Sequence, residues 1–113
     1  MIAGSLKQRV ALEDLCYAAQ QSAEKALKAL LVAKDRTFPY TRDIATLITV
    51  VVDAGVDVPE RVRNSALLSR YAFATRYPGG EPPVTAEQYA DAIRAAGEVL
   101  DWVVSVLPAS EQT

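Results

Sequence analysis

Apolar residues recur at spacings of three and four over most of the chain, and this spacing predicts helices. The first segment is rich in Ala, Leu, Lys, Glu and Gln, which favour helix formation. Its pattern predicts a helix from about Ser5 or Ala11 to Lys34, before Pro39 interrupts the spacing. One face of this helix carries the apolar residues Leu12, Leu15, Cys16, Ala19, Ala23, Ala26, Leu27, Leu30 and Leu31.

Two more helices are predicted before a connector rich in Pro and Gly. Thr41 is the expected N-cap of the second helix, and Gly55 is its expected stop. The β-branched run "TVVV" is also compatible with a strand, but the preceding spacing favours a helix that buries Ile44, Leu47, Ile48, Val51 and Val52. Asp57 and Pro59 predict the cap and first turn of a third helix, whose apolar positions are Val62, Ala66, Leu67 and Phe73.

A fourth helix is predicted from the capping box that Thr85 and Gln88 form. Pro108 closes it, and its apolar positions are Tyr89, Ile93, Ala96, Leu100, Val103, Val104 and Leu107. With 113 residues and no internal repeat, the chain predicts one all-α domain over residues 1–113. The expected architecture is an antiparallel four-helix bundle with up-and-down order.

The composition excludes several classes of function. A net charge of −2 argues against a chain that is basic throughout, although residues 61–76 hold four arginines and no acid. The single cysteine and the absence of histidine argue against a zinc site and against a Ser or Cys triad with histidine. No cofactor is expected. The first residues do not resemble a signal peptide, and residues 44–52 are too few to span a membrane, so a cytoplasmic protein is expected.

Two polar groups are candidates for binding. Gln20, Gln21, Glu24, Lys25 and Lys28 form either the solvated face of the first helix or a strip that meets a nucleotide or a partner. In the segment "SRYAFATRYPGG", Arg70, Arg76 and Tyr77 either end a helix or bind a phosphate and stack on a base. The residues alone leave both alternatives open.

Three segments in order, "AAQQSAEKALKALLVAKD", "PYTRDIATLI" and "LLSRYAFATRYPGG", resemble the HEPN domain. The resemblance covers about residues 12–107. It implies a helical bundle that usually dimerises, and often a partnership with a small nucleotidyltransferase in a toxin–antitoxin pair. Some branches of the family are metal-independent ribonucleases that use an arginine followed by a histidine.

This chain departs from that ribonuclease pattern. Arg42 stands where the family commonly has histidine, and no histidine follows Arg70 or Arg76. A guanidinium stays protonated near neutral pH and cannot act as a general base. We therefore expect a binding module without catalytic residues, which holds nucleotide or RNA through Lys25, Lys28, Arg42, Arg70, Arg76 and Tyr77. The alternatives are a ribonuclease with a degenerate, arginine-based site and a purely structural helical module.

The resemblance also bears on assembly. Members of the family usually carry a full helix before the "QQSAEKALKALL" segment, whereas only about ten residues precede it here, so we expect a shortened N-terminal helix. The apolar face of residues 12–31 would then be left open, and exposed leucines are costly. A homodimer, or a complex with a nucleotidyltransferase, is expected to cover it. Gln21 and Glu24 are the expected partner or dimer surface.

Overall fold

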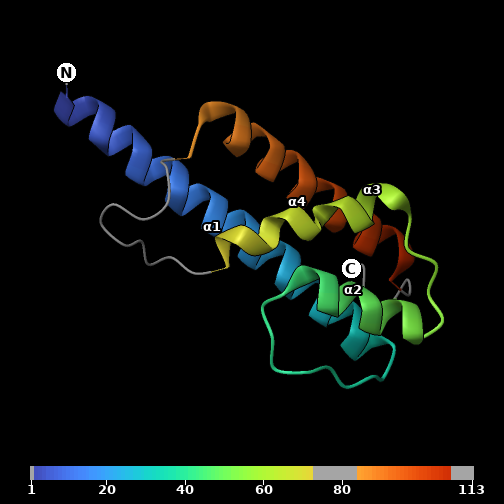
Figure 1. Ribbon diagram of the computed structural model, residues 1–113. Helices are drawn as coiled ribbons and strands as arrows, with labels where there is room; N and C mark the ends of the chain where they lie inside the picture. Colours follow the sequence, from blue (N-terminus) through green and yellow to red (C-terminus); the bar gives the residue numbers. More distant parts are fainter. Residues whose placement is uncertain (1, 73–83, 108–113) are drawn as a thin grey trace.

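The computed structural model describes residues 2–72 and 84–107, with side chains from residue 11 onwards (Figure 1). Its elements are the helices α1 (Ile2–Ala33), α2 (Ile44–Asp53) and α3 (Glu60–Arg63), the 3₁₀ helix η1 (Asn64–Tyr71) and the helix α4 (Ala86–Val106). Every element in these residues is helical, which confirms the all-α prediction. The expectations for Phe73, Arg76, Tyr77 and Pro108 lie outside the described residues.

Helix α1 is continuous from Ile2, so the residues before Ala11 extend the predicted helix rather than forming a separate one. Its apolar face is not left open, in contrast to the expectation from sequence. Helices α2 and α4 and the 3₁₀ helix η1 all pack against α1. They bury Cys16, Ala19, Ala23, Leu27, Leu30 and Leu31, and only Leu15 of the predicted stripe is widely exposed.

The second predicted helix is present as α2, and the strand alternative is wrong. Ile44, Leu47, Ile48 and Val51 are buried, as the spacing predicted. The N-cap is Asp43 rather than Thr41, because Thr41 Oγ1 accepts a hydrogen bond of 3.0 Å from the Asp43 amide in a turn before the helix. Gly55 follows the helix with φ of 90°, a backbone conformation that residues with a Cβ rarely adopt.

The third predicted helix divides into two parts. A single α-helical turn, α3, begins after Pro59 rather than after Asp57, and η1 continues it. The buried residues Val62, Ser65, Leu68 and Tyr71 lie three apart, which is the period of a 3₁₀ helix. The prediction of Ala66 and Leu67 as core residues assumed the α-helical period and was wrong for Leu67, which is 44% exposed.

Helix α4 begins with the predicted capping box: Gln88 N donates to Thr85 Oγ1, and Thr85 N donates to Gln88 Oε1, both at 3.0 Å. Its buried face differs from the predicted one. Ala96 and Val103 are buried as expected, but Ile93, Leu100 and Val104 are exposed. The core is instead completed by Ala92, Ala95, Val99 and Trp102.

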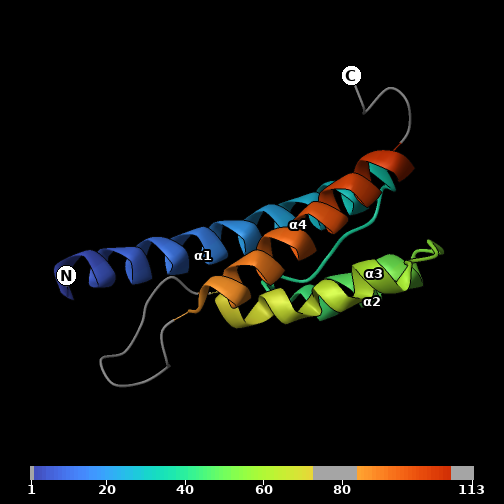
Figure 2. The ribbon, with the colours of Figure 1, turned by 90° about the horizontal axis from the view of Figure 1, so that it is seen from above.

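The helices do not alternate in direction, so the predicted up-and-down order is wrong. Helices α1, α2 and α4 run the same way in both views, and α3 with η1 runs back (Figures 1 and 2). Arg61 at the start of α3 pairs with Glu98 in the second half of α4, as opposite directions require. The cause is the connection of residues 34–43, because ten extended residues reach about 33 Å and return the chain along α1. Among the described helices, none is long and apolar enough to cross a bilayer.

Candidate functional site

One polar face of α1 meets the connection of residues 34–43. At its centre is Gln20, which the α-helical spacing placed among polar residues but which is fully buried. Its Nε2 donates to the backbone oxygen of Arg42 at 2.8 Å and to Glu24 Oε1 at 3.3 Å. Its Oε1 accepts no hydrogen bond from the described residues. Gln20 therefore ties the returning connection to α1.

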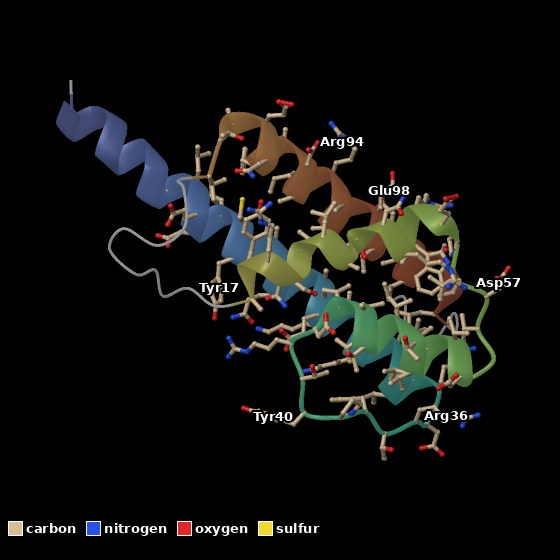
Figure 3. The ribbon with its side chains drawn as sticks, in the orientation of Figure 1. Tyr17, Arg36, Tyr40, Asp57, Arg94 and Glu98 are labelled. Atoms are coloured by element: carbon tan, nitrogen blue, oxygen red, sulfur yellow. The ribbon has the colours of Figure 1, made fainter. Side chains whose placement is uncertain are left out.

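The side chain of Arg42 links three parts of the fold. Its Nη1 donates to the carbonyl oxygen of Ala72, after η1, at 3.0 Å, and lies 3.4 Å from the hydroxyl of Tyr17 on α1. Gln21 Nε2 donates to the same Tyr17 hydroxyl. Figure 3 shows Tyr17 beside the end of η1. The guanidinium is thus held in place by two neighbouring elements.

One turn further along α1, Lys28 and Glu24 form an ion pair of 2.8 Å. Their side chains are 22% and 9% exposed, respectively, so the pair is partly shielded from water. Lys28 Nζ also lies 5.5 Å from the centre of the Phe38 ring. These contacts fix the ammonium group where α1 faces the connection.

A pocket of about 450 Å³ opens between these groups. It is lined by Glu24 and Lys28 from α1 and by Tyr40, Thr41 and Arg42 from the connection. Tyr40 is fully exposed, and Figure 3 shows it projecting from the connection into solvent. Two cations that stand far apart in the sequence therefore share one pocket with a free aromatic ring. In the described part of the chain, no three Cys, Asp or Glu side chains gather as a metal site requires.

Asp43 is the last residue of the connection, and its side chain anchors the connection to α2 and η1. Its carboxylate accepts hydrogen bonds from the hydroxyls of Thr46, at 2.8 Å, and Ser69, at 2.9 Å. These two bonds, first Thr46 and then Ser69, lower the pKa of Asp43 below its ordinary value of 3.8. The Ser69 hydroxyl in turn accepts from the amide of Ile44 at 2.9 Å. The connection, α2 and η1 are joined through this one carboxylate.

The structure brings together only some of the predicted binding residues. Lys28 and Arg42 line the pocket, while Lys25 is exposed elsewhere on α1. Arg70 is also exposed, with its guanidinium 5.5 Å from the ring centre of Tyr71. Arg76 and Tyr77 lie outside the described residues. The expected partner surface at Gln21 and Glu24 is not one exposed strip, because Glu24 is buried and Gln21 is bonded to Tyr17.

The arginines between residues 61 and 76 do not form the uninterrupted cationic segment that the sequence suggested. Arg61 pairs with Glu98 at 2.9 Å, and Arg63 Nε donates to the carbonyl oxygen of Val58. The absence of acids in a stretch of sequence does not exclude an acid from another helix. Glu98 on α4 supplies that acid here.

Three members of the site, Tyr17, Tyr40 and Thr41, were not predicted from the sequence. Tyr17 had a detectable signal, because it lies three and four residues before Gln20 and Gln21 and so shares their helix face. Tyr40 and Thr41 had none, since their place in the pocket depends on the path of the connection.

Comparisons with known proteins gave one match. Neither the curated proteins nor the solved structures contain a significant match to the chain. The family model described as HEPN domain matches residues 3–107, which is nearly the whole chain. The helical fold of the described residues agrees with that match, and the chain belongs to the HEPN domain family.

Proposed function

We propose that the pocket between α1 and the connection binds the phosphate group of a nucleotide or of an RNA chain. The observation that carries this proposal is that Lys28 and Arg42 line the same pocket. An ammonium and a guanidinium at one site suit phosphate oxygens. Membership of a family related to nucleotides and RNA supports the same class of ligand.

The charges of the pocket favour a selective site over a strongly basic surface. Glu24 neutralises part of the charge of Lys28, and Arg42 adds the second positive charge. The lining residues carry one net positive charge, so attraction to an anion is modest and depends on salt. Glu24 also holds the Lys28 ammonium in position before the ligand arrives, which reduces the entropy lost on binding.

The other lining residues suit the remaining parts of a nucleotide. The exposed ring of Tyr40 is available to stack on a base, and base–aromatic stacking contributes roughly 1–3 kcal/mol. The hydroxyl of Thr41 offers a neutral hydrogen-bonding group. The lining residues include no histidine, the side chain that most often transfers protons near neutral pH, which supports binding rather than proton transfer.

Titration of the protein with a fluorescent adenine nucleotide and with a short labelled RNA tests the proposal. Lys28→Ala and Arg42→Ala are each expected to weaken binding about tenfold or more, since a hydrogen bond to a charged group contributes about 1.5–3 kcal/mol. The matched controls are Lys34→Ala and Arg36→Ala, which remove the same charges outside the pocket. Equal losses in the controls, or no binding of either ligand at low salt, would exclude the pocket.

The same RNA sample separates binding from cleavage. We expect the labelled RNA to remain intact after long incubation without metal ions. Cleavage that Arg70→Ala or Arg76→Ala abolishes would instead favour the ribonuclease alternative, in which one of these arginines takes part in the reaction. Lys25, Arg70, Arg76 and Tyr77 remain proposed additional contacts for a longer RNA.

We also propose, from membership of the family, that the chain acts as the partner of a small nucleotidyltransferase in a toxin–antitoxin pair. The test is copurification of the tagged full chain from its native host, followed by identification of the bound proteins. Recovery of a nucleotidyltransferase in a fixed ratio supports the partnership. Its absence from repeated purifications would count against it.

A further inference from the structure

Glu24 is an acid in a pocket that we propose for an anion. It lines the pocket together with Lys28, and its side chain is 9% exposed. A carboxylate in this position repels a phosphate group, so it weakens the binding of a bare anion. Holding the Lys28 ammonium in place does not require the charge, because a neutral glutamine offers an acceptor oxygen of the same kind. The negative charge therefore points to a hydrogen-bond donor on the ligand.

The carboxylate of Glu24 is fixed by one donor at each of its oxygens. Gln20 Nε2 donates to Oε1 at 3.3 Å, and Lys28 Nζ donates to Oε2 at 2.8 Å. Gln20 and Lys28 lie one helical turn before and one turn after Glu24 on α1, so the helix itself orients the group. An ionised carboxylate has about four lone-pair positions. These two bonds use one position at each oxygen, so each oxygen has the capacity to accept one more hydrogen bond.

The other lining residues indicate which part of a nucleotide faces Glu24. The ring of Tyr40 is fully exposed and projects into solvent, so a base stacked on it lies at the rim of the pocket (Figure 3). The phosphate binds to Lys28 and Arg42 in the proposed function. The ribose joins these two groups, and its hydroxyls donate hydrogen bonds, whereas the oxygens of an ionised phosphate only accept them. The sugar is therefore the part of the ligand that suits a shielded carboxylate.

We propose that Glu24 recognises the adjacent 2′- and 3′-hydroxyls of a ribose, one hydroxyl at each carboxylate oxygen. This inference rests on the proposed function and specifies its ligand as a ribonucleotide in which both hydroxyls are free. Such a group occurs in a free 5′-ribonucleotide and at the 3′ end of an RNA chain. An acidic side chain binds the ribose 2′-hydroxyl in the same way in dinucleotide-binding folds, and the 2′-hydroxyl is the group by which proteins distinguish RNA from DNA.

The burial of Glu24 makes this recognition selective. Its side chain is 9% exposed, so few water molecules can replace a missing ribose hydroxyl at the carboxylate. A hydrogen bond to a charged group changes affinity about tenfold or more, and this sets the expected loss for each hydroxyl. Gln20 and Lys28 keep their bonds to the carboxylate when a hydroxyl is missing, so the loss stays below that of a site whose polar group is left without any partner.

Isothermal titration calorimetry of the full chain with three ligands tests the inference. The ligands are adenosine 5′-monophosphate and its 2′-deoxy and 3′-deoxy analogues, which share the base and the phosphate. Each deoxy analogue is expected to bind the wild-type chain about tenfold more weakly than the ribonucleotide, or weaker still. The ratio of the Kd values is expected to stay constant as salt is raised, because the hydroxyls are neutral, while every Kd increases.

Glu24→Gln removes the charge and keeps the size of the side chain. Its ratio of deoxynucleotide to ribonucleotide Kd is expected to fall to within about threefold. Inorganic pyrophosphate, which carries no ribose, is expected to bind this variant more tightly than wild type, because the net charge of the lining residues rises from one to two positive charges. If Glu24 served only to hold Lys28, the variant would bind all ligands more weakly and the ratio would stay unchanged.

Glu98→Gln is the matched control. Glu98 also pairs with a cation, Arg61 at 2.9 Å, but it lies on α4 outside the pocket. The control is expected to keep the wild-type ratio and the wild-type affinity for pyrophosphate. Circular dichroism compares the helical content of both variants with that of wild type, and the comparison of the three nucleotides on the wild-type chain requires no variant.

A short RNA with a free 3′-hydroxyl and the same RNA with a 3′-phosphate distinguish the two sources of the ribose. Tighter binding of the free end assigns the site to RNA termini, and equal binding of the two RNAs assigns it to free ribonucleotides. Equal affinity of the wild-type chain for all three nucleotides, or a ratio that persists in Glu24→Gln, would overturn the inference and leave the phosphate site intact. Absence of binding of any nucleotide would instead remove the proposed function, and the ribose site with it.

Discussion

Gln20 donates a hydrogen bond of 2.8 Å to the backbone oxygen of Arg42, across 22 residues of sequence. This bond connects a fully buried amide on α1 to the residue whose guanidinium lines the pocket. Because Arg42 also reaches Ala72, the position of its side chain depends on α1 and on the end of η1. The pocket is therefore set by tertiary contacts of one loop residue rather than by the polar face of α1 alone.

Substitution of Gln20 distinguishes its contribution to the stability of the fold from its contribution to nucleotide binding. Gln20→Leu removes two donated bonds but also the buried Oε1 that lacks a partner, so we expect the free energy of unfolding to change by less than about 1 kcal/mol. Nucleotide binding is nevertheless expected to weaken, because the Arg42 backbone loses its tether. Urea denaturation and nucleotide titration measure the two effects.

Gln20→Glu is the matched variant, since it keeps the size of the side chain. Its carboxylate would be buried beside Glu24 and the carbonyl of Arg42, both of which are acceptors. An unpaired buried charge costs roughly 3–5 kcal/mol, and the loss of stability is expected to diminish at acidic pH, where the new carboxyl takes up a proton. A Gln20→Glu protein as stable as Gln20→Leu at neutral pH would show that residue 20 is not buried.

Asp43 makes stability depend on pH below about 4. Its pKa is lowered in the folded chain by the hydroxyls of Thr46 and Ser69, so its carboxylate stabilises the fold above the ordinary value of 3.8. This contribution is lost as the pH falls through the folded pKa, because the protonated acid has no preference for the folded state. Asp43→Asn keeps a side-chain oxygen beside these hydroxyls but does not titrate, so its stability difference from wild type is expected to shrink as the pH is lowered.

Urea unfolding between pH 6 and pH 3 measures that difference. The control is Asp57→Asn, which removes an exposed carboxylate that makes none of these hydroxyl contacts. A constant difference between wild type and Asp43→Asn over the whole range would contradict the assignment of the lowered pKa to Asp43.

The sequence predicted the helices well where one physical signal was sufficient. The capping box of Thr85 and Gln88 placed the start of α4 correctly because it is a local pair of reciprocal bonds. Gly55 marked the end of α2 because only the backbone conformation at that residue matters. The apolar face of α1 was largely correct, since a long helix samples its period many times.

The errors have a common cause in contacts between distant residues. Ile93, Leu100 and Val104 fit the apolar period of α4, but the helix buries Val99 and Trp102 instead. A helix with two apolar faces leaves the choice of the core face to its neighbours. The direction of α2 and the members of the pocket depended likewise on the returning connection, whose path is fixed by Gln20, Arg42 and Asp43.

Gly55 offers a test of backbone conformation without a change in packing. Its φ is 90°, and a Cβ at this position meets nothing within 4 Å. Gly55→Ala is therefore expected to lower the free energy of unfolding by about 1 kcal/mol through backbone strain alone. Gly55→Asn is the comparison variant, because asparagine tolerates positive φ better and should lose less stability. If urea denaturation showed Gly55→Asn to be less stable than Gly55→Ala, this explanation would be contradicted.

The neighbouring leucines of η1 test the 3₁₀ period directly. Leu68 is fully buried, whereas Leu67, which the α-helical period favoured, is 44% exposed. Leu68→Ala is expected to cost roughly 2–5 kcal/mol, because it removes buried methyl groups and leaves a cavity. Leu67→Ala is expected to cost less, about 1 kcal/mol, since nearly half of the Leu67 surface stays in contact with water and its loss leaves no enclosed cavity. Urea denaturation of the two variants under the same conditions compares residues that differ in burial but not in type. If Leu67→Ala proved the more destabilising, residues 64–71 would follow the α-helical period, and the arrangement that places Ser69 beside Asp43 would have to be revised.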